Sequence, residues 1–303
     1  MNDIDAIRAR LRYEPMWHQR AMLSTVIAAA IRDGEVIAEF SAFVVEVPIV
    51  DHEAEFVVVS ARHCIAASLM AGADVYLRVP LEPAGIDPNH PPYVWETVVV
   101  PTDGWAHDEN TDVSVAPLRL ERLPPNHFLL SWPRGSFIGG RPAVFGDDVI
   151  IFGRAALGDQ GLVIRRRGAL ATHENPTVNL LVEPETYAGV RVFVVEANVT
   201  KGMSGGLVLW TTGGIGPNDN IALGVVHGYA YANRGAEESW AKDVADGNAE
   251  QAIIKAQTEI EAARNELVYV IPSDEIHGSV DDVARATAAA HGNPDPRVQQ
   301  RLW

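Results

Sequence analysis

A serine between glycines is the feature of this chain that most directly suggests chemistry. Residues 202–206 read Gly-Met-Ser-Gly-Gly and lie between two apolar runs. Glycines beside Ser204 allow a tight turn, and they let backbone N–H groups come close to an oxyanion. An incidental serine in a glycine-rich turn has the same letters, so the side chains that could activate Ser204 decide the interpretation.

A nucleophilic serine needs a base that takes its proton and an acid that orients the base. His63 lies in a predicted small-residue turn after an apolar, strand-like run, and Asp112 begins Asp-Val-Ser-Val-Ala-Pro-Leu. The alternation after Asp112 predicts a strand with one buried face, so this carboxylate has apolar neighbours. Three other carboxylates compete for the acid role from the polar stretch before the strand: Asp103, Asp108 and Glu109. We expect a base, acid and nucleophile in the order His63, Asp112, Ser204.

These segments together resemble the motifs of trypsin-like serine peptidases, in the order of that family. Ser-Ala-Arg-His-Cys around His63 is similar to their Thr-Ala-Ala-His-Cys, and the Asp112 segment is similar to their Asp-Ile-Ala-Leu-Leu. Gly-Met-Ser-Gly-Gly is similar to their Gly-Asp-Ser-Gly-Gly. Segments 146–153, 166–171 and 222–228 also resemble strands of the second barrel in that family. The resemblance covers about residues 24–290 and is to bacterial members of the cytoplasmic type.

The resemblance implies a serine endopeptidase that cleaves peptide bonds through an acyl-enzyme. His63 would take the proton of Ser204, Asp112 would orient the imidazole, and the N–H groups of Gly202 and Ser204 would form the oxyanion hole. Because His63 must be neutral to act, we expect activity to fall as the pH drops through roughly 6–7. The expected partners are a protein or peptide substrate and a regulatory protein.

The resemblance also places a substrate pocket. Asn198 would lie near its base, and His227, Gly228 and Tyr229 would line its wall. Asn198 is uncharged, so a preference for Arg or Lys is not expected. Tyr229 could narrow the pocket in favour of small residues, and His227 could favour an acidic residue.

Two departures from the family pattern bear on regulation. Met203 stands before the serine, where many secreted members have an aspartate that pairs with a newly cut N-terminus. A methionine cannot form that ion pair, so activation by that route is excluded. Arg62 before the histidine is unusual, and its side chain could reach the cleft or point to water.

Two alternatives remain open at this point. Gly-x-Ser-x-Gly also occurs in α/β-hydrolases, where a helix follows the serine and the order is serine, acid, histidine. Asp274 and His277 lie downstream and would fit that order, but residues 207–210 followed by Thr-Thr-Gly-Gly predict a short strand and a turn. The second alternative is a catalytically silent protein that uses a protease fold for binding or scaffolding, because fold does not dictate function.

The rest of the chain predicts an all-β protein. Hydrophobic residues make up 47% of the sequence, and short strand-like runs separated by Gly, Pro, Asn or Asp recur throughout, which is typical of sandwiches and barrels. Together with the resemblance, they predict two six-stranded antiparallel β-barrels with the site between them. The expected strands are 26–30, 35–47, 56–60, 75–79, 94–100, 113–120, 149–152, 162–164, 190–197, 207–209, 221–226 and 267–271.

The expected domain organisation places His63 and Asp112 in the first barrel and Ser204 in the second. Two Ala-rich segments, 248–266 and 279–290, have helical composition, and a further helix is predicted near residues 3–11. The predicted units are an N-terminal extension (1–20), a first barrel (21–125), a linker (126–145), a second barrel (146–275) with a helical insertion (248–266), and a C-terminal helix and tail (276–303).

Composition argues against several partners. The net charge is −16, which repels phosphates, so no nucleic-acid partner is expected. The longest apolar stretch is far below the roughly 20 residues that span a bilayer, and the N-terminus lacks the apolar region of a signal peptide. Cys64 is the only cysteine, so it is expected to be a free thiol in a reducing cytoplasm. No metal or nucleotide motif is present, so no cofactor is expected.

Overall fold

The computed structural model describes twelve stretches of the chain: residues 17–50, 53–81, 97–108, 110–127, 129–137, 144–154, 163–172, 176–182, 185–200, 202–211, 220–229 and 267–292. The predicted helices near residues 3–11 and at 248–266 lie outside these stretches. Every other predicted strand or helix has at least part of its length within them.

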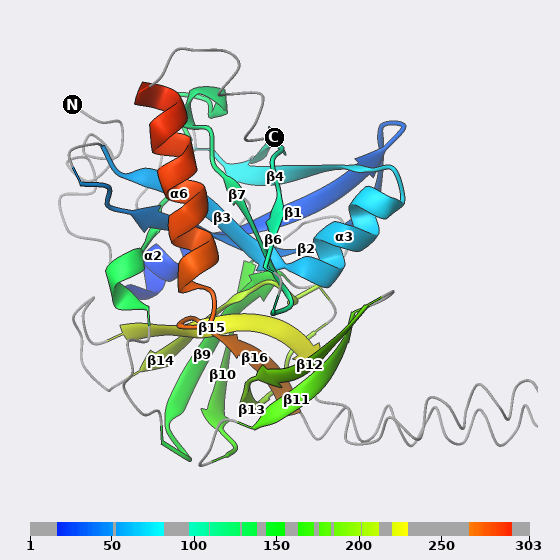
Figure 1. Ribbon diagram of the computed structural model, residues 1–303, viewed down its shortest axis with the longest axis vertical. Helices are drawn as coiled ribbons and strands as arrows, with labels where there is room; N and C mark the ends of the chain where they lie inside the picture. The colour runs from blue at the N-terminus through cyan, green and yellow to red at the C-terminus, as the bar shows by residue number, and fades with distance from the viewer. Residues whose placement is uncertain are drawn as a thin grey trace, which may run out of the picture.

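The first half of the chain forms a curled antiparallel sheet (Figure 1). Its strands follow the order β5-β4-β1-β2-β3-β7-β6, and β8 (Trp132–Pro133) pairs with β2 in parallel. β5 and β6 lie at opposite ends of this order, yet only residues 103–105 connect them. The two edges must therefore lie next to each other, which gives the sheet the form of a barrel. The strands are β1 (Thr25–Arg32), β2 (Glu35–Val47), β3 (Glu55–Ala61), β4 (Asp74–Pro80), β5 (Thr97–Thr102), β6 (Ala106–His107) and β7 (Val113–Pro117).

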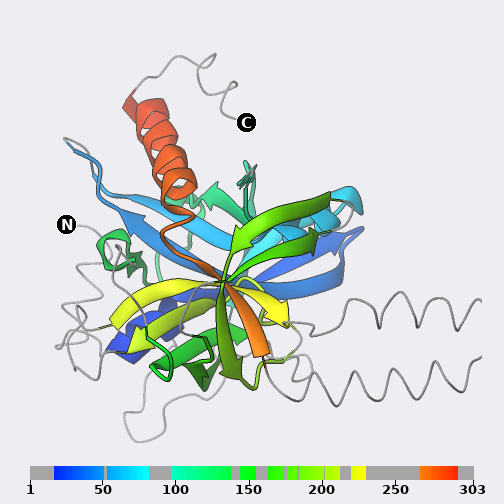
Figure 2. The ribbon, with the colours of Figure 1, turned by 60° about the horizontal axis from the view of Figure 1, so that its bottom comes forward.

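The second half forms a closed six-stranded barrel in the order β10-β13-β16-β15-β14-β9. Its members are β9 (Asp148–Arg154), β10 (Val163–Leu170), β13 (Phe193–Ala197), β14 (Leu207–Thr211), β15 (Asn220–Tyr229) and β16 (Leu267–Pro272). A separate hairpin of β11 (Thr177–Val182) and β12 (Glu185–Arg191) extends from it (Figure 2). The predicted all-β class and two-barrel architecture are confirmed. The first barrel differs from the expected six strands, because in the described chain it is a curled, open sheet of eight strands. The single strand expected at 190–197 is wrong, because Val192 separates β12 from β13 and the two strands belong to different sheets.

Burial explains another difference from the predicted pattern. All five residues of β7 are buried, although its alternation predicts one buried face. The C-terminal helix α6 (His277–Gly292) packs against β3 and β7, so it covers the outer face that alternation assigns to solvent. Figure 1 shows this helix lying across the first barrel. A covered sheet no longer needs polar residues on its outer side.

One apolar cluster spans the two barrels, and each barrel also has a cluster of its own. A single cluster of buried side chains includes Phe43 and Val57 of the first barrel, Phe152 and Leu207 of the second, and Val280 of α6. Trp132, in the segment between the barrels, is 1% exposed within the same cluster. This continuity fixes the barrels relative to each other, as a site built from both of them requires.

Three helices and two 3-10 turns lie in the described chain beside the strands. They are α2 (Trp17–Ser24), α3 (Arg62–Met70) and α6, with 3-10 turns η1 (Leu120–Arg122) and η2 (Arg134–Ser136). Sequence reasoning expected only a turn at His63 and missed α3. Alanines and Leu69 after His63 favour a helix, and Gly72 (φ +71°) follows its end, so the signal was present. No helix in the described stretches is both long and apolar enough to cross a membrane.

Candidate active site

Strand pairing brings His63 and Asp112 together. β3 and β7 are antiparallel neighbours, and Ala61 at the end of β3 pairs with Val113 at the start of β7. His63 lies two residues beyond Ala61 in α3, and Asp112 lies one residue before Val113. The backbone N–H of Arg62 also donates to the carbonyl of Asp112 at 3.1 Å, which holds the two segments side by side.

The His63–Asp112 pair has the geometry of a base and its orienting acid. Nδ1 of His63 lies 2.6 Å from Oδ2 of Asp112, and the backbone N–H of His63 donates to Oδ1 at 2.8 Å. The Asp112 side chain is fully buried, whereas 31% of the His63 side chain is exposed. Because the carboxylate engages Nδ1, the other ring nitrogen, Nε2, is left to accept a proton.

A second histidine reaches the same carboxylate from the other barrel. Nδ1 of His227, in β15, lies 2.5 Å from Oδ2 of Asp112, and the rings of His227 and His63 meet edge to face with centroids 5.3 Å apart. The β15–β16 register shifts between Val226 and Gly228, so His227 sits at a bulge. Bulges re-aim side chains, which explains how a barrel strand directs His227 toward the first barrel.

The pKa values of this pair follow from their contacts. Burial raises the pKa of the Asp112 carboxyl, but the hydrogen bonds from His227 and His63 outweigh it and lower the value to about 2. Burial lowers the pKa of His63, but the neighbouring sulfur of Cys64 and the Asp112 carboxylate outweigh it, so this pKa lies well above 6.5. Asp112 is therefore ionised near neutral pH, and the imidazole of His63 is a stronger base than usual.

Ser204 lies in a turn that the first barrel holds in place. The backbone N–H of Ser41 in β2 donates to the carbonyl of Ser204 at 3.0 Å, and the hydroxyl of Ser41 donates to the carbonyl of Gly202 at 2.7 Å. The hydroxyl of Ser60 in β3 donates to the carbonyl of Ser41 at 2.7 Å. The sequence did not indicate Ser41 or Ser60 as site residues. Nothing in the local sequence of Ser41 predicts its contact with Gly202, which lies 161 residues further along the chain.

The glycines of this turn are required by its geometry. Gly202 and Gly205 have φ values of +96° and +84°. A Cβ on Gly205 would lie 2.1 Å from the carbonyl oxygen of Ser41 and 2.5 Å from the hydroxyl of Ser60. The turn can approach the first barrel this closely only because residue 205 has no side chain.

The Ser204 hydroxyl is half-buried and makes no hydrogen bond with the part of the chain that the structure describes. The structure thus pairs His63 with Asp112 but does not form the hydrogen bond from Ser204 to His63. A Cβ built on Gly228, which follows His227, would lie 4.0 Å from the Ser204 hydroxyl oxygen, so β15 runs beside the serine. Within the described stretches, the N–H groups of Gly202 and Ser204 donate to no carbonyl, which leaves them available to an oxyanion.

The other predicted site residues differ in where they lie relative to Ser204. Gly228 faces Ser204, Asn198 is exposed, and the side chain of Tyr229 lies outside the described residues. Nδ1 of His227 contacts Asp112, and the place of His227 on the wall of a substrate pocket stays a prediction. Arg62 donates to the backbone carbonyl of Asp108 at 3.0 Å, in the turn that leads to β7.

The α/β-hydrolase alternative is wrong. β14 follows Ser204 where that fold requires a helix, and the barrel strands around it pair antiparallel. Asp274 forms an ion pair with Arg191 at 2.5 Å, and His277 packs against the ring of Phe137. Neither side chain is in contact with Ser204.

His63, Asp112 and His227 are also the one group in the described stretches with donor atoms close enough to suggest a metal ion. A tetrahedral zinc ion with bonds of about 2.0–2.1 Å holds its ligand atoms roughly 3.3 Å apart. Here both ring nitrogens lie 2.5–2.6 Å from the same carboxylate oxygen, which is far below that separation and below the usual length of an N–H···O hydrogen bond. The arrangement fits a hydrogen-bonded network better than a metal centre.

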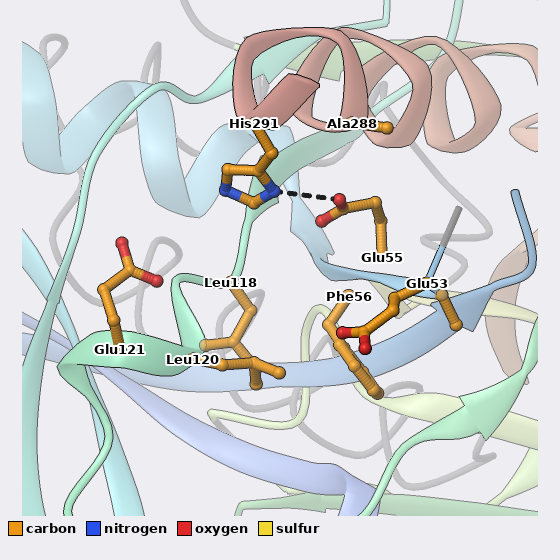
Figure 3. Close-up of a pocket in the computed structure, with 9 residues that line it drawn as sticks. Glu53, Glu55, Phe56, Leu118, Leu120, Glu121, Ala288 and His291 are labelled. Atoms are coloured by element: carbon orange, nitrogen blue, oxygen red, sulfur yellow. Dashed lines mark hydrogen bonds and ion pairs between the residues drawn. The ribbon is translucent and has the colours of Figure 1, made fainter. Parts of the chain in front are cut away.

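A separate cavity of about 300 Å³ lies at the far end of the same strands (Figure 3). Phe56, Leu118 and Leu120 form its apolar side, and Glu55 there accepts from Nδ1 of His291 at 3.0 Å. Ala61 lies six residues along β3 from Glu55, so at about 3.3 Å per residue the cavity is roughly 20 Å from the His63 end. It contains none of the predicted catalytic groups.

Comparisons with known proteins add limited information. No protein-family model matches the chain, and no curated protein matches it. Among solved structures, the Rv3671c protease of M. tuberculosis in its active form is 18% identical, with a TM-score of 0.49 over 88% of this chain and 83% of that one. The serine endoprotease of Yersinia pestis is 11% identical, with a TM-score of 0.47 over 90% of this chain and 68% of that one. These values are too low to carry an argument about function.

The fold is evident from the architecture of the chain itself. A curled antiparallel sheet carries His63 and Asp112, a closed six-stranded barrel carries Ser204, and the three residues lie where the two meet. The chain has the two-barrel, chymotrypsin-like fold that its sequence motifs implied.

Proposed function

We propose that the protein is a serine endopeptidase that cleaves peptide bonds through an acyl-enzyme. The observation that carries this proposal is the Asp112–His63 hydrogen bond at a fully buried carboxylate, beside a turn in which the Ser204 hydroxyl makes no hydrogen bond in the described chain. An ionised, buried acid serves to orient a base, and the base here has its second nitrogen available.

In the proposed reaction, His63 acts in turn as base and acid in each half. Nε2 of His63 takes the proton as Ser204 Oγ attacks the carbonyl carbon, and the N–H groups of Gly202 and Ser204 receive the oxyanion. The imidazolium then gives its proton to the leaving amine, and Asp112 stabilises the cation in between. Hydrolysis of the ester by water, with His63 again as base, releases the acid and restores the serine.

The test is covalent labelling of the purified protein with a fluorophosphonate, which reacts with activated serines and needs no knowledge of the substrate. We expect labelling of the wild type and none in Ser204→Ala or His63→Ala. Ser136→Ala is a matched control, because the hydroxyl of Ser136 donates to the carbonyl of Pro133 within the turn around η2 and to none of the predicted catalytic residues. Labelling that persists in Ser204→Ala would contradict the proposal.

One observation favours a second candidate, a silent protein of the same fold. Ser204 and His63 are not hydrogen-bonded to each other, although apo sites often show such bonds long or misaligned. A wild type that stays unlabelled, both alone and with cell extract added, would favour this candidate. Labelling only with extract would indicate a latent peptidase that needs a regulatory protein.

A further inference from the structure

The sequence motifs of the site do not account for the contact between His227 and Asp112. Asp112 accepts three hydrogen bonds from two side chains and one backbone group: Nδ1 of His63, the N–H of His63, and Nδ1 of His227. The two from His63 come from the first barrel, which also holds Asp112. The bond from His227 comes from the second barrel, which holds Ser204.

We propose that His227 is a positioning residue of this site, which holds the Asp112 carboxylate from the second barrel and so fixes the imidazole of His63 relative to Ser204. The inference rests on the proposed hydrolytic function and assigns to His227 a role in that same site. His227 does not touch the reacting atoms in this role and acts through Asp112.

The location of His227 explains how its contact with Asp112 could affect the site. Gly228, the next residue, lies beside the Ser204 hydroxyl, so one strand segment runs past the nucleophile and also binds the acid. The other described ties across this junction, from Ser41, bind the backbone of the serine turn and not the acid or base. Since misplacement by about 1 Å can cost two orders of magnitude in rate, a direct link between the acid and the second barrel has a clear effect.

The chemistry of the ring agrees with this role. The pKa of Asp112 is about 2, so near neutral pH the carboxylate can only accept, and His227 must carry its proton on Nδ1 to bind it. Only 15% of the His227 side chain is exposed. A ring committed in this way does not offer its Nδ1–H to an acidic residue of a substrate. In the described chain, the titratable groups near it are Asp112 and His63, with Cys64 beside His63.

The first test compares His227→Asn with His227→Leu. The amide of asparagine can place an N–H donor near the position of Nδ1 and does not titrate, whereas leucine has similar bulk and no donor. We expect the rate constant for fluorophosphonate labelling of Ser204 to fall about 10- to 100-fold in His227→Leu, because a hydrogen bond to a buried charge is lost. In His227→Asn it should stay within about threefold. The same changes at His291, which pairs with Glu55 at the far cavity, are the matched controls and should leave the rate unchanged.

A second measurement does not depend on activity. Proton NMR should show two low-field Nδ1–H resonances in the wild type, one from each histidine on Asp112. The His227 resonance should vanish in both variants, while that of His63 should remain in His227→Asn and shift or broaden in His227→Leu. This result in a wild type that is never labelled would support the inference while refuting the proposed function. Equal labelling rates in all folded variants, or an unchanged His63 resonance in His227→Leu, would overturn the inference about His227.

Discussion

The pKa of a single imidazole sets the pH range in which this protein should act. The sequence predicts a fall in activity as the pH drops through roughly 6–7, from the ordinary pKa of histidine. The sulfur of Cys64 and the Asp112 carboxylate, against the opposing effect of burial, hold the pKa of His63 well above 6.5. His63 is therefore protonated, and unable to act as a base, at pH values where a free histidine is already neutral.

We predict that the labelling rate of Ser204 falls as the pH decreases through a value above 6.5. The measurement is the rate of fluorophosphonate labelling between pH 5 and 9. In Cys64→Ala the fall should move to lower pH, because one of the groups that raise the pKa of His63 is gone. A wild-type rate that is constant from pH 5 to 8 would show that His63 is not the base.

A second prediction concerns the acid. Asp112→Asn keeps the shape of the side chain but removes its charge, so it no longer holds His63 in the tautomer with a proton on Nδ1. We expect labelling to slow by about 10³–10⁴-fold, as for the equivalent change in a serine triad. Asp103, an exposed carboxylate that the sequence left as a competitor, provides the control. Asp103→Asn should label at the wild-type rate, and the reverse pattern would reassign the acid.

Among the helices, α6 packs on the strands β3 and β7 of the first barrel. Near its start, α6 is tied to the segment between the barrels, where Arg134 donates to both carboxylate oxygens of Asp281 at 2.9 Å. His277 begins the helix and packs on Phe137, and no hydrogen bond in the described chain satisfies its Nε2. Burial and the charge of Arg134 lower its pKa, against the opposing effect of Asp281 and Asp274.

The sign of the resulting pH dependence follows from that direction. Because the folded-state pKa of His277 is below its unfolded value of 6.5, its neutral form contributes stability above pH 6.5, and this is lost as the pH falls through the folded-state pKa. We predict that the free energy of unfolding in urea decreases less between pH 7.5 and 5.5 in His277→Gln than in the wild type. An identical decrease in both proteins would mean that His277 is not a source of acid sensitivity.

For the molecule as a whole, the contact between the serine turn and the first barrel joins the two halves of the site. Gly205 approaches Ser41 so closely that a Cβ would lie 2.1 Å from a backbone oxygen, which cannot move without shifting β2. The same contact places Ser204 against the barrel that carries its base. Stability and catalysis therefore depend on one interface.

We predict that Gly205→Ala lowers the free energy of unfolding by about 3 kcal/mol or more and abolishes labelling. Gly72→Ala is the matched control, because Gly72 also has a positive φ (+71°) but no atom within 4 Å of its would-be Cβ. It should cost only about 1 kcal/mol, from backbone strain alone, and leave labelling intact. Equal losses in the two variants would mean that the collision at Gly205 is relieved without cost.

The amino-acid sequence was sufficient to predict the all-β class, the two barrels and the choice of His63, Asp112 and Ser204 as the residues to examine. Those features rest on local patterns: strand periodicity, glycines around the serine, and short motifs that survive in order along the chain. The covering of β7 by α6 and the role of Ser41 as a tie to the serine turn were decided only by the tertiary structure.

The same holds for the contact between His227 and Asp112, which lie 115 residues apart. In the sequence, His227 is one histidine in a strand, and its motif context predicts a pocket wall. A bulge in β15 turns it toward the other barrel, and the packing of the two barrels brings the carboxylate within reach. Such contacts depend on how two sheets pack against each other, and side chains far from one another in sequence leave no local pattern that records the packing.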